Sequence, residues 1–279
     1  MKRKFLALSM VTVLGAILVG CGEKETGSPT PAPSDDETFV VGMEANYPPY
    51  NWSQLNDKNG AVKINDSMEY AGGYDVEIAK RVAEGLGKEL VIVKSDWDGL
   101  IPSVQLGKID AIIAGMSPTA KRLESIDFSD TYYESQLVMV VNSEGPYANA
   151  TSLADFNGAR VTAQLGTFHY DMIDQIPGVN GQAAMADFAT MRISLLSGKI
   201  DAYVSERPEG ISAELADSKY KMIELTDGFK TSPEETQTSV GVAKGSELTE
   251  QINRILAEIS AQERIDLMDD AIENQPLAQ

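Results

Sequence analysis

The pentapeptide Gly-Lys-Ile-Asp-Ala occurs twice in this chain of 279 residues, at positions 107–111 and again at positions 198–202. Each copy follows a segment with helical periodicity, "WDGLIPSVQLG" in the first case and "DFATMRISLLSG" in the second. Glycine favours the end of a helix because it takes the left-handed conformation easily, and "KIDAIIAG" and "KIDAYVS" have the composition of buried strands. Both copies predict a helix that ends at glycine and leads directly into a strand, although chance or an old duplication would explain the pentapeptide alone.

Strands and helices alternate on both sides of this repeat. "FVVGM" from Phe39 and "ELVIVKS" from Glu89 have the composition of strands, and "YDVEIAKRVAEGLG" between them places its apolar residues near one helical face. A second series starts near Ser152 and contains "RVTAQLG", "FHYDMIDQI" and the second pentapeptide. Such alternation predicts mainly parallel sheets flanked by helices. Two series over about 240 residues predict an α/β protein with two lobes.

The N-terminal segment has the layout of an export signal. Residues 2–4 are basic and residues 5–19 are apolar and uncharged; a membrane anchor is the alternative, but a span needs about 20 apolar residues. Leu-Val-Gly-Cys, ending at Cys21, resembles the lipobox of bacterial lipoproteins, in which the cysteine is lipidated and becomes the mature N-terminus. We therefore expect removal of residues 1–20, a lipid anchor on Cys21, and a flexible tether over residues 21–38.

Composition argues against several functions. The formal charge is -19 at pH 7, so we expect no nucleic-acid binding, which depends on basic side chains that neutralise phosphates. Cys21 is the only cysteine, which rules out an intramolecular disulfide and a cysteine metal cluster. His169 is the only histidine and has no visible metal-binding partners, so we expect it at the surface or in a supporting role. We expect no cofactor and no metal.

Groups of opposite charge follow the two pentapeptides. Ligands of open α/β sheets bind beyond the carboxyl ends of strands, where the first copy is followed by Ser117 and Pro118, a favourable helix start, and then by Arg122. A helix start and a guanidinium both suit a carboxylate, and an ordinary helix start with a solvated arginine is the alternative. Ser205, a possible cap, and Glu206 follow the second copy, and a carboxylate there suits an ammonium group. The two lobes would then hold opposite ends of one zwitterion.

Longer motifs enclose these residues: "VGMEANYPPYNW", "GGYDVEIAKRVAEGLG", "SDWDGLIPSVQLGKIDAIIAGMSPTAKRLESIDFSDTYY", "AQLGTFHYD" and "GKIDAYVSERPEG". From Phe39 to the C-terminus the chain resembles the bacterial extracellular solute-binding proteins of family 3, which bind polar amino acids for ABC importers. The resemblance implies a two-lobed periplasmic-binding-protein-like fold of type II, with two hinge strands. It places the first lobe at 39–134 plus 237–279 and the second lobe at 135–236.

The resemblance also implies a function. We expect a monomeric amino-acid-binding protein, not an enzyme, that is held outside the cell membrane and delivers a free amino acid to ABC permease and ATPase subunits. A dehydratase-like enzyme on the same fold is one alternative, with Glu44 or Glu206 as a proton donor or acceptor, and a ligand-gated sensor is another. The sequence shows no nucleophile–base pair, metal motif or phosphate loop.

Ligand contacts carry over from the family to matching positions of this chain. The resemblance implies that Arg122 binds the α-carboxylate and that Glu206, where the family often has the shorter aspartate, binds the α-ammonium group. It also implies that the ligand side chain lies between Tyr47 and Trp97. The remaining contacts are expected from the backbone of Gly115, Ser117, Thr167 and Phe168; Gly115 replaces a frequent serine, and Phe168 replaces a frequent threonine or serine.

Glu44 determines the expected side-chain preference. It follows the first predicted strand, where binders of cationic amino acids carry an acid, and with Tyr47 and Trp97 it would form an acidic, aromatic slot that attracts a cation. We hypothesise a preference for lysine or arginine. Glutamine binders also carry an acid here, so glutamine or another polar amino acid is the alternative. Gln164 is expected to face the ligand side chain.

Other residues receive structural interpretations. Asp75 and Glu77 are expected to face water, and the segment 53–73 to add a flap over the pocket mouth. Four aromatic residues are expected to pack in the core: Tyr50, Trp52, Tyr132 and Tyr133.

Overall fold

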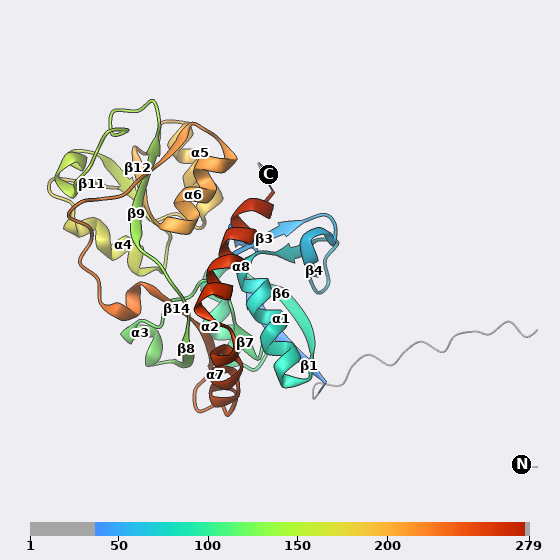
Figure 1. Cartoon of the computed structure of the whole chain (residues 1–279). Helices are drawn as coiled ribbons and strands as arrows, with labels where there is room; N and C mark the ends of the chain where they lie inside the picture. The colour runs from blue at the N-terminus through green and yellow to red at the C-terminus, as the bar shows by residue number, and fades with distance from the viewer. Residues whose placement is uncertain (1–36, 277–279) are drawn as a thin grey trace, which may run out of the picture. The chain divides into compact units, whose positions relative to one another are not determined.

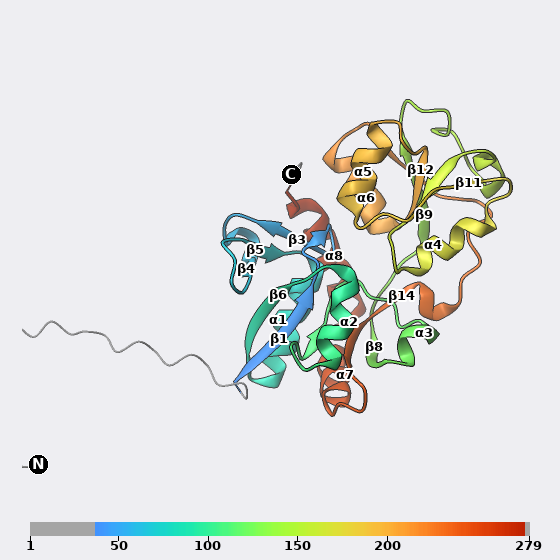
Figure 2. The same ribbon diagram turned by 180° about the vertical axis from the view of Figure 1, so that it is seen from behind.

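The computed structural model describes residues 37–276 (Figures 1 and 2). The predicted signal peptide, Cys21 and the predicted tether up to residue 36 lie outside these residues. Between residues 37 and 276, no helix has both the length and the apolar character that crossing a bilayer requires.

A five-stranded sheet of order β6-β1-β7-β14-β8 forms the centre of the first lobe. Its strands are β1 (Thr38–Met43), β6 (Glu89–Lys94), β7 (Ala111–Ile112), β8 (Ile126–Glu134) and β14 (Gln237–Ala243). Helices α1, α7 and α8 pack together on one face and α2 lies on the other (Figures 1 and 2). The helices are α1 (Tyr74–Leu86), α2 (Trp97–Gln105), α3 (Ala120–Leu123), α7 (Leu248–Glu258) and α8 (Ala261–Asn274). The apolar face predicted for α1 is confirmed, since Val76, Ile78, Ala79 and Val82 are buried.

A second five-stranded sheet, of order β11-β10-β12-β9-β13, forms the centre of the second lobe. Its strands are β9 (Leu137–Asn142), β10 (Arg160–Thr162), β11 (Asn180–Gly181), β12 (Ala202–Glu206) and β13 (Tyr220–Ile223). The helices are η2 (Leu153–Phe156), α4 (Phe168–Met172), η3 (Ile173–Gln175), α5 (Phe188–Leu196) and α6 (Arg207–Ala216), and η4 (Pro233–Glu235) follows them. The prediction of mainly parallel sheets is confirmed, because only β14 in one sheet and β9 in the other run against their neighbours.

The chain crosses twice between the two sheets, and we call these two crossing segments the passages. Each antiparallel strand comes directly after one passage. β8 ends at Glu134 in the first sheet, and β14 returns to it at Gln237. The passages lie side by side, since the backbone N–H of Ser135 donates to the carbonyl of Thr236 at 2.9 Å. We propose that they form the hinge, with lobe boundaries after residues 134 and 236.

The two pentapeptides make equivalent contacts in the two lobes. In the first lobe, Asp110 accepts from the backbone N–H of Val40 through its side chain and donates its own N–H to the Val40 carbonyl, both at 2.8 Å. In the second lobe, Asp201 makes the same pair of contacts with Arg160, again both at 2.8 Å. The strands begin only at the final alanine, later than predicted, because the aspartate itself joins the corner to the neighbouring parallel strand. The repeat is therefore a structural unit.

The extension after the first motif forms a small antiparallel sheet on the first lobe. Its strands are β2 (Asn46–Tyr47), β3 (Asn51–Gln54), β4 (Val62–Lys63) and β5 (Tyr70–Gly72), with η1 (Lys58–Gly60) between β3 and β4. Ile64 is buried and bridges to Ile92 of β6, which fixes the extension to the main sheet. None of residues 53–73 lines the pocket that contains Arg122 and Glu206, whereas Ser53 and Glu69 line a neighbouring pocket that shares Phe188 with it, so the flap over the pocket mouth stays a prediction.

Candidate functional site

Most of the predicted ligand-binding residues surround one pocket between the lobes. Its lining is Tyr47, Trp97, Gly115, Ser117, Arg122, Gln164, Thr167, Phe168, His169, Phe188 and Glu206. Glu44 does not line this pocket, but its carboxylate accepts hydrogen bonds from Gln164. The first lobe contributes Arg122, and the second contributes Glu206 at the end of β12.

Arg122 is a buried guanidinium, and no carboxylate of residues 37–276 lies within ion-pair distance of it. Its Nη1 donates to the carbonyl of Ser117 at 2.8 Å and its Nη2 to the carbonyl of Gly166 at 3.3 Å. The guanidinium lies over the ring of Trp97, 5.1 Å from the centroid. Burial lowers the pKa of Arg122 to about 10, which still leaves it charged at neutral pH. The alternative of a solvated arginine is wrong, and a carboxylate ligand would offer this cation its missing partner.

The helix start predicted at Ser117 and Pro118 is also wrong. The helix α3 begins at Ala120 with Thr119 before it and contains only four residues. Ser117 does not cap it, because its hydroxyl donates to the carbonyl of Glu235 in the returning passage at 3.1 Å. The positive character of this side of the pocket therefore comes from Arg122.

Glu206 is the counterpart of Arg122 and is only 3% exposed. Its Oε2 accepts from the hydroxyl of Tyr50 at 2.7 Å, and its Oε1 lies 3.2 Å from Nε2 of His169. No Lys or Arg side chain of the described residues forms an ion pair with it. Ser205 belongs to β12 and does not cap α6. A ligand ammonium group would supply the cation that Glu206 lacks.

A neighbouring acid shows the contrast. Glu209 is fully buried, but Arg192 forms an ion pair with it at 2.7 Å, and the hydroxyls of Tyr203 and Ser205 also donate to it. Its charge is therefore compensated within the protein. Of these two buried glutamates, only Glu206 is left for a cationic ligand group.

Aromatic rings form the wall of the pocket. Tyr47 stacks on Phe188 of the second lobe with centroids 4.5 Å apart and on Tyr50 at 4.8 Å. The hydroxyl of Tyr47 is buried without a hydrogen-bond partner among the described residues. Gly115 has a positive φ of 62°, and a Cβ there would lie 2.9 Å from Cε1 of Tyr47. A serine at this position would therefore collide with the ring.

Glu44 and Gln164 meet across the two lobes. Nε2 of Gln164 donates to both carboxylate oxygens of Glu44, at 3.0 and 3.2 Å, and to the carbonyl of Ala186 at 3.2 Å. Burial raises the pKa of Glu44 to about 7, the hydrogen bond from Gln164 opposes this, and nearby aspartates raise it further. Those aspartates are Asp187, Asp96 and Asp98. With Glu44, Trp97 and other residues they line an adjoining pocket of about 420 Å³.

Three contacts around the pocket were not predicted. Phe188 lines the pocket but belongs to none of the motifs from which ligand contacts were predicted. Tyr50 is fully buried, as expected of a core residue, but its hydroxyl also contacts Glu206. His169 is buried, lies beside Glu206 and itself lines the pocket, so a surface position is excluded and the supporting role stays a prediction. Among the described residues, no cluster of His, Cys, Asp and Glu could hold a metal.

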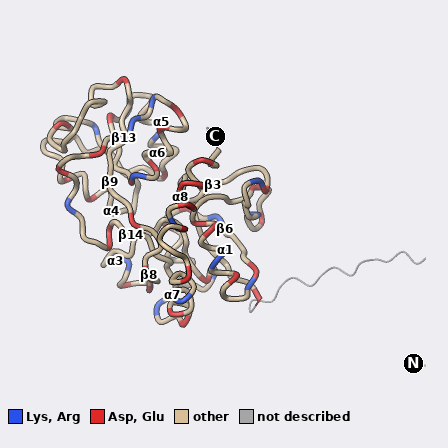
Figure 3. Tube along the Cα trace, viewed as in Figure 1, with Lys and Arg blue, Asp and Glu red and all other residues tan. Residues whose placement is uncertain are grey.

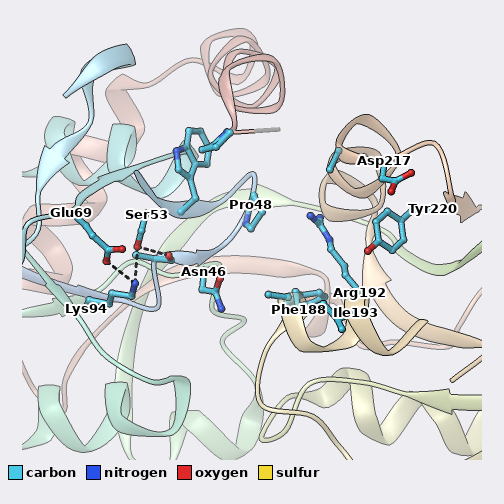
Figure 4. Close-up of a pocket in the computed structure, with 15 residues that line it drawn as sticks. Asn46, Pro48, Ser53, Glu69, Lys94, Phe188, Arg192, Ile193, Asp217 and Tyr220 are labelled. Atoms are coloured by element: carbon cyan, nitrogen blue, oxygen red, sulfur yellow. Dashed lines mark hydrogen bonds and ion pairs between the residues drawn. The ribbon is translucent and has the colours of Figure 1, made fainter. Parts of the chain in front are cut away.

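Another pocket of about 310 Å³, shown in Figure 4, contains two cations with partners of their own. Lys94 donates to Glu69 at 3.1 Å and to the hydroxyl of Ser53 at 2.8 Å, and Arg192 pairs with Glu209. Figure 3 shows acidic and basic residues interspersed along the described chain. Arg122 and Glu206 have no such Arg, Lys, Asp or Glu partner among the described residues, which favours the pocket that contains them as the ligand site.

A two-lobed α/β fold that presents a guanidinium from one lobe and a carboxylate from the other is characteristic of a solute-binding protein. Residues 39–271 match the bacterial extracellular solute-binding proteins, family 3, and the chain belongs to this family. It is a binding protein and not an enzyme, which excludes the dehydratase alternative.

Similar proteins bind several amino acids. The arginine-binding extracellular protein ArtP of Bacillus subtilis is 26% identical over 262 residues, which cover 92% of each chain. A probable histidine-binding protein of Campylobacter jejuni is 29% identical over 232 residues, which cover 81% of this chain and 84% of the relative. Many of the relatives are substrate-binding proteins of amino acid ABC transporters.

Solved structures share the fold. An ancestral arginine-binding protein, solved with arginine and with glutamine, is 30% identical with a TM-score of 0.68 in both cases. The match covers 84% of this chain and 96% or 97% of the ancestral protein.

Proposed function

We propose that this protein is the amino-acid-binding component of an ABC importer and prefers a cationic amino acid, arginine or lysine. The observation that carries the proposal is that two buried groups of opposite charge, Arg122 and Glu206, line one pocket between two lobes, and that neither has a Lys, Arg, Asp or Glu side chain of the described residues within ion-pair distance. An α-amino acid has the complementary charges one carbon apart. Arg122 would bind the carboxylate with backbone N–H groups of Ser117, Thr167 and Phe168, and Glu206 would bind the ammonium group with the Gly115 carbonyl.

The preference for a cationic ligand side chain rests on the negative charge of Glu44. A zwitterion matches Arg122 and Glu206 and leaves Glu44 without a cationic partner. Asp96, Asp98 and Asp187 add to the negative potential at Glu44. A guanidinium or ammonium on the ligand side chain would compensate part of this charge, and the ring of Trp97 would attract it further. The names of relatives that bind arginine support the same preference.

Calorimetric titration of ligand-free protein tests the preference. We expect arginine or lysine to bind at least about tenfold more tightly than glutamine, equivalent to about 1.4 kcal/mol. Tight glutamine binding with no response to arginine and lysine would contradict the cationic preference and favour the glutamine alternative. Mass spectrometry of a co-purified ligand provides an independent identification.

We also propose that the mature protein is a monomer held outside the cell membrane by a lipid on Cys21, where it serves permease and ATPase subunits. The support is the lipobox-like segment alone, which lies outside the described residues. Mass spectrometry of the membrane-extracted protein should find a lipid-modified Cys21 as the N-terminus. Cys21→Ser should release the protein from the membrane fraction, and retention of this variant would contradict the proposal.

A further inference from the structure

Asp75 is a buried carboxylate that the proposed ligand contacts leave out. It lies in the first turn of α1 and is inaccessible to solvent, so the prediction that it faces water is wrong. None of the ion pairs of residues 37–276 includes it. A buried carboxylate without a cation destabilises a fold, and such groups often serve function.

One set of contacts connects Asp75 to the pocket through Tyr132. The hydroxyl of Tyr132 donates to Oδ1 of Asp75 at 2.7 Å, and Nδ2 of Asn51 donates to Oδ2 at 2.7 Å. The Tyr132 oxygen in turn accepts from the backbone N–H of Gly115 at 3.1 Å. Gly115 lines the pocket, so Asp75 orients the hydroxyl that fixes this peptide.

A second connection runs through the backbone. The N–H of Asp75 donates to the carbonyl of Tyr50 at 2.8 Å. The hydroxyl of Tyr50 donates to Glu206 at 2.7 Å. Asp75 is thus linked to both groups that would bind the ammonium of a ligand, Glu206 and Gly115.

We propose that Asp75 is a positioning residue for the α-ammonium group of the ligand, fixing the Gly115 peptide through Tyr132 and adding its negative charge to that of Glu206. This inference rests on the proposed function, because it requires an amino acid whose ammonium group lies near Glu206. In a pocket that excludes water, a second carboxylate near the ammonium group strengthens the attraction.

The electrostatics of Asp75 agree with this role. Burial raises the pKa of Asp75 to about 7, hydrogen bonds from Tyr132, Asn51 and the backbone of Gly115 oppose the rise, and the charge of Glu206 adds to it. Tyr74 and Tyr132, the other titratable groups that face it, stay neutral because burial raises the pKa of each tyrosine above its usual value. An arriving ammonium group would stabilise the ionised form of Asp75.

Asp75→Asn removes the charge of this side chain but keeps its size and shape. Oδ1 of Asn51 has no hydrogen-bond partner among the described residues, so its amide can turn and accept from the new amide. The fold should therefore survive the substitution. Glu77→Gln is the matched control, because it removes one charge from the same helix at a residue that contacts Lys80 and Arg81 near the surface.

Titration with two ligands tests the proposal: arginine, and 5-guanidinopentanoate, which lacks the α-ammonium group. We expect Asp75→Asn to weaken arginine binding about tenfold and binding of the analogue less than about twofold, and Glu77→Gln to change neither. Equal losses for both ligands, or no loss, would overturn the proposal. Tyr132→Phe, which removes the link through the Tyr132 hydroxyl but keeps the charge of Asp75, should weaken arginine selectively by about threefold and replaces the test if the first variant does not fold.

Different measurements test the proposed preference for a cationic amino acid and the proposed role of Asp75. Titration of the unmutated protein with arginine tests the proposed preference alone. If glutamine proves to be the ligand, the comparison is made between glutamine and the same molecule without its α-ammonium group. The same selective loss in Asp75→Asn would then support the role of Asp75 although the cationic preference had failed.

Discussion

Two arginines near the cleft differ in their partners, and the difference defines their roles. Arg192 forms an ion pair with Glu209, whereas within the described part of the chain Arg122 donates to the backbone carbonyls of Ser117 and Gly166 and to no carboxylate. A guanidinium that has only neutral acceptors gains more from an arriving carboxylate than one that already has an anionic partner.

Substitution at Arg122 and at Glu44 should separate the two ends of the ligand. Arg122→Ala is expected to weaken binding of every amino acid at least about 100-fold, because the α-carboxylate loses a buried cation. Glu44→Gln should weaken only the cationic amino acids, by about tenfold, since it removes the charge but keeps a hydrogen-bonding group. Calorimetry with arginine, lysine and glutamine measures both effects. Equal losses for all ligands in both variants would refute this division.

Arginine affinity should depend on pH near neutrality. The pKa of Glu44 is raised to about 7 by burial and by Asp187, Asp96 and Asp98. The acid is therefore mostly neutral at pH 6 and mostly ionised at pH 8, and arginine should bind up to about tenfold more weakly at pH 6. Glu44→Gln should remove the contribution of Glu44, whereas that of Asp75, whose pKa is also about 7, should remain. A profile unchanged by Glu44→Gln would be inconsistent with this assignment.

At the scale of single residues, sequence motifs identified the groups that touch the ligand but not those behind them. Arg122 and Glu206 could be predicted because each follows a recognisable strand. Asp75 alternates with apolar residues on α1, and this pattern alone favours a solvent-facing position. Its burial depends on Tyr132 and Asn51, which are distant in sequence and meet it only in the folded lobe. Phe188 escaped prediction for the same reason.

At the scale of elements, the pentapeptide correctly predicts a helix end followed by a strand, but not the residue at which the strand begins. The glycine ends of both helices were predictable, and Gly107 and Gly198 have positive φ angles of 65° and 71°. The first residues of the two strands were not predictable, because the aspartate of each pentapeptide forms hydrogen bonds to the neighbouring strand instead. Ser117 is the opposite case. The predicted helix start is absent there, and the serine hydroxyl donates to the carbonyl of Glu235, which is distant in sequence.

Loss of the aspartate should destabilise each lobe. Asp110→Ala and Asp201→Ala are each expected to lower the free energy of unfolding by about 1 to 2 kcal/mol, because a backbone N–H loses a charged acceptor. Asp201→Ala should cost more, since Arg160 also pairs with Asp201. The hydrogen bond from Arg160 holds the pKa of Asp201 below its usual value, so this stabilisation is present above the usual pKa and is lost as the pH falls through the folded-state value. Urea unfolding at pH 7 and in acid measures the difference, and a pH-independent difference would contradict it.

At the scale of the whole molecule, side chains of the two lobes bond to one another around the pocket. Tyr50 donates to Glu206, and Gln164 donates to Glu44. Each of these carboxylates is thus held by a neutral donor of the opposite lobe, in the place where a ligand cation would bind. No pattern along the chain could predict these pairs, since they depend on the distance between the lobes.

Gln164 should therefore act as an internal competitor for the ligand side chain. A glutamine ligand replaces one amide on Glu44 by another and gains little, whereas a guanidinium replaces a neutral donor by a charged one. Gln164→Met, which keeps the length but not the amide, is expected to raise the affinities for glutamine and for arginine alike, each by about fivefold, because either ligand must displace the same amide from Glu44. Calorimetry measures both affinities, and small-angle scattering of the ligand-free variant should show a larger radius of gyration because a bond between the lobes is lost. Unchanged affinities for both ligands would show that the amide of Gln164 does not compete with the ligand side chain for Glu44.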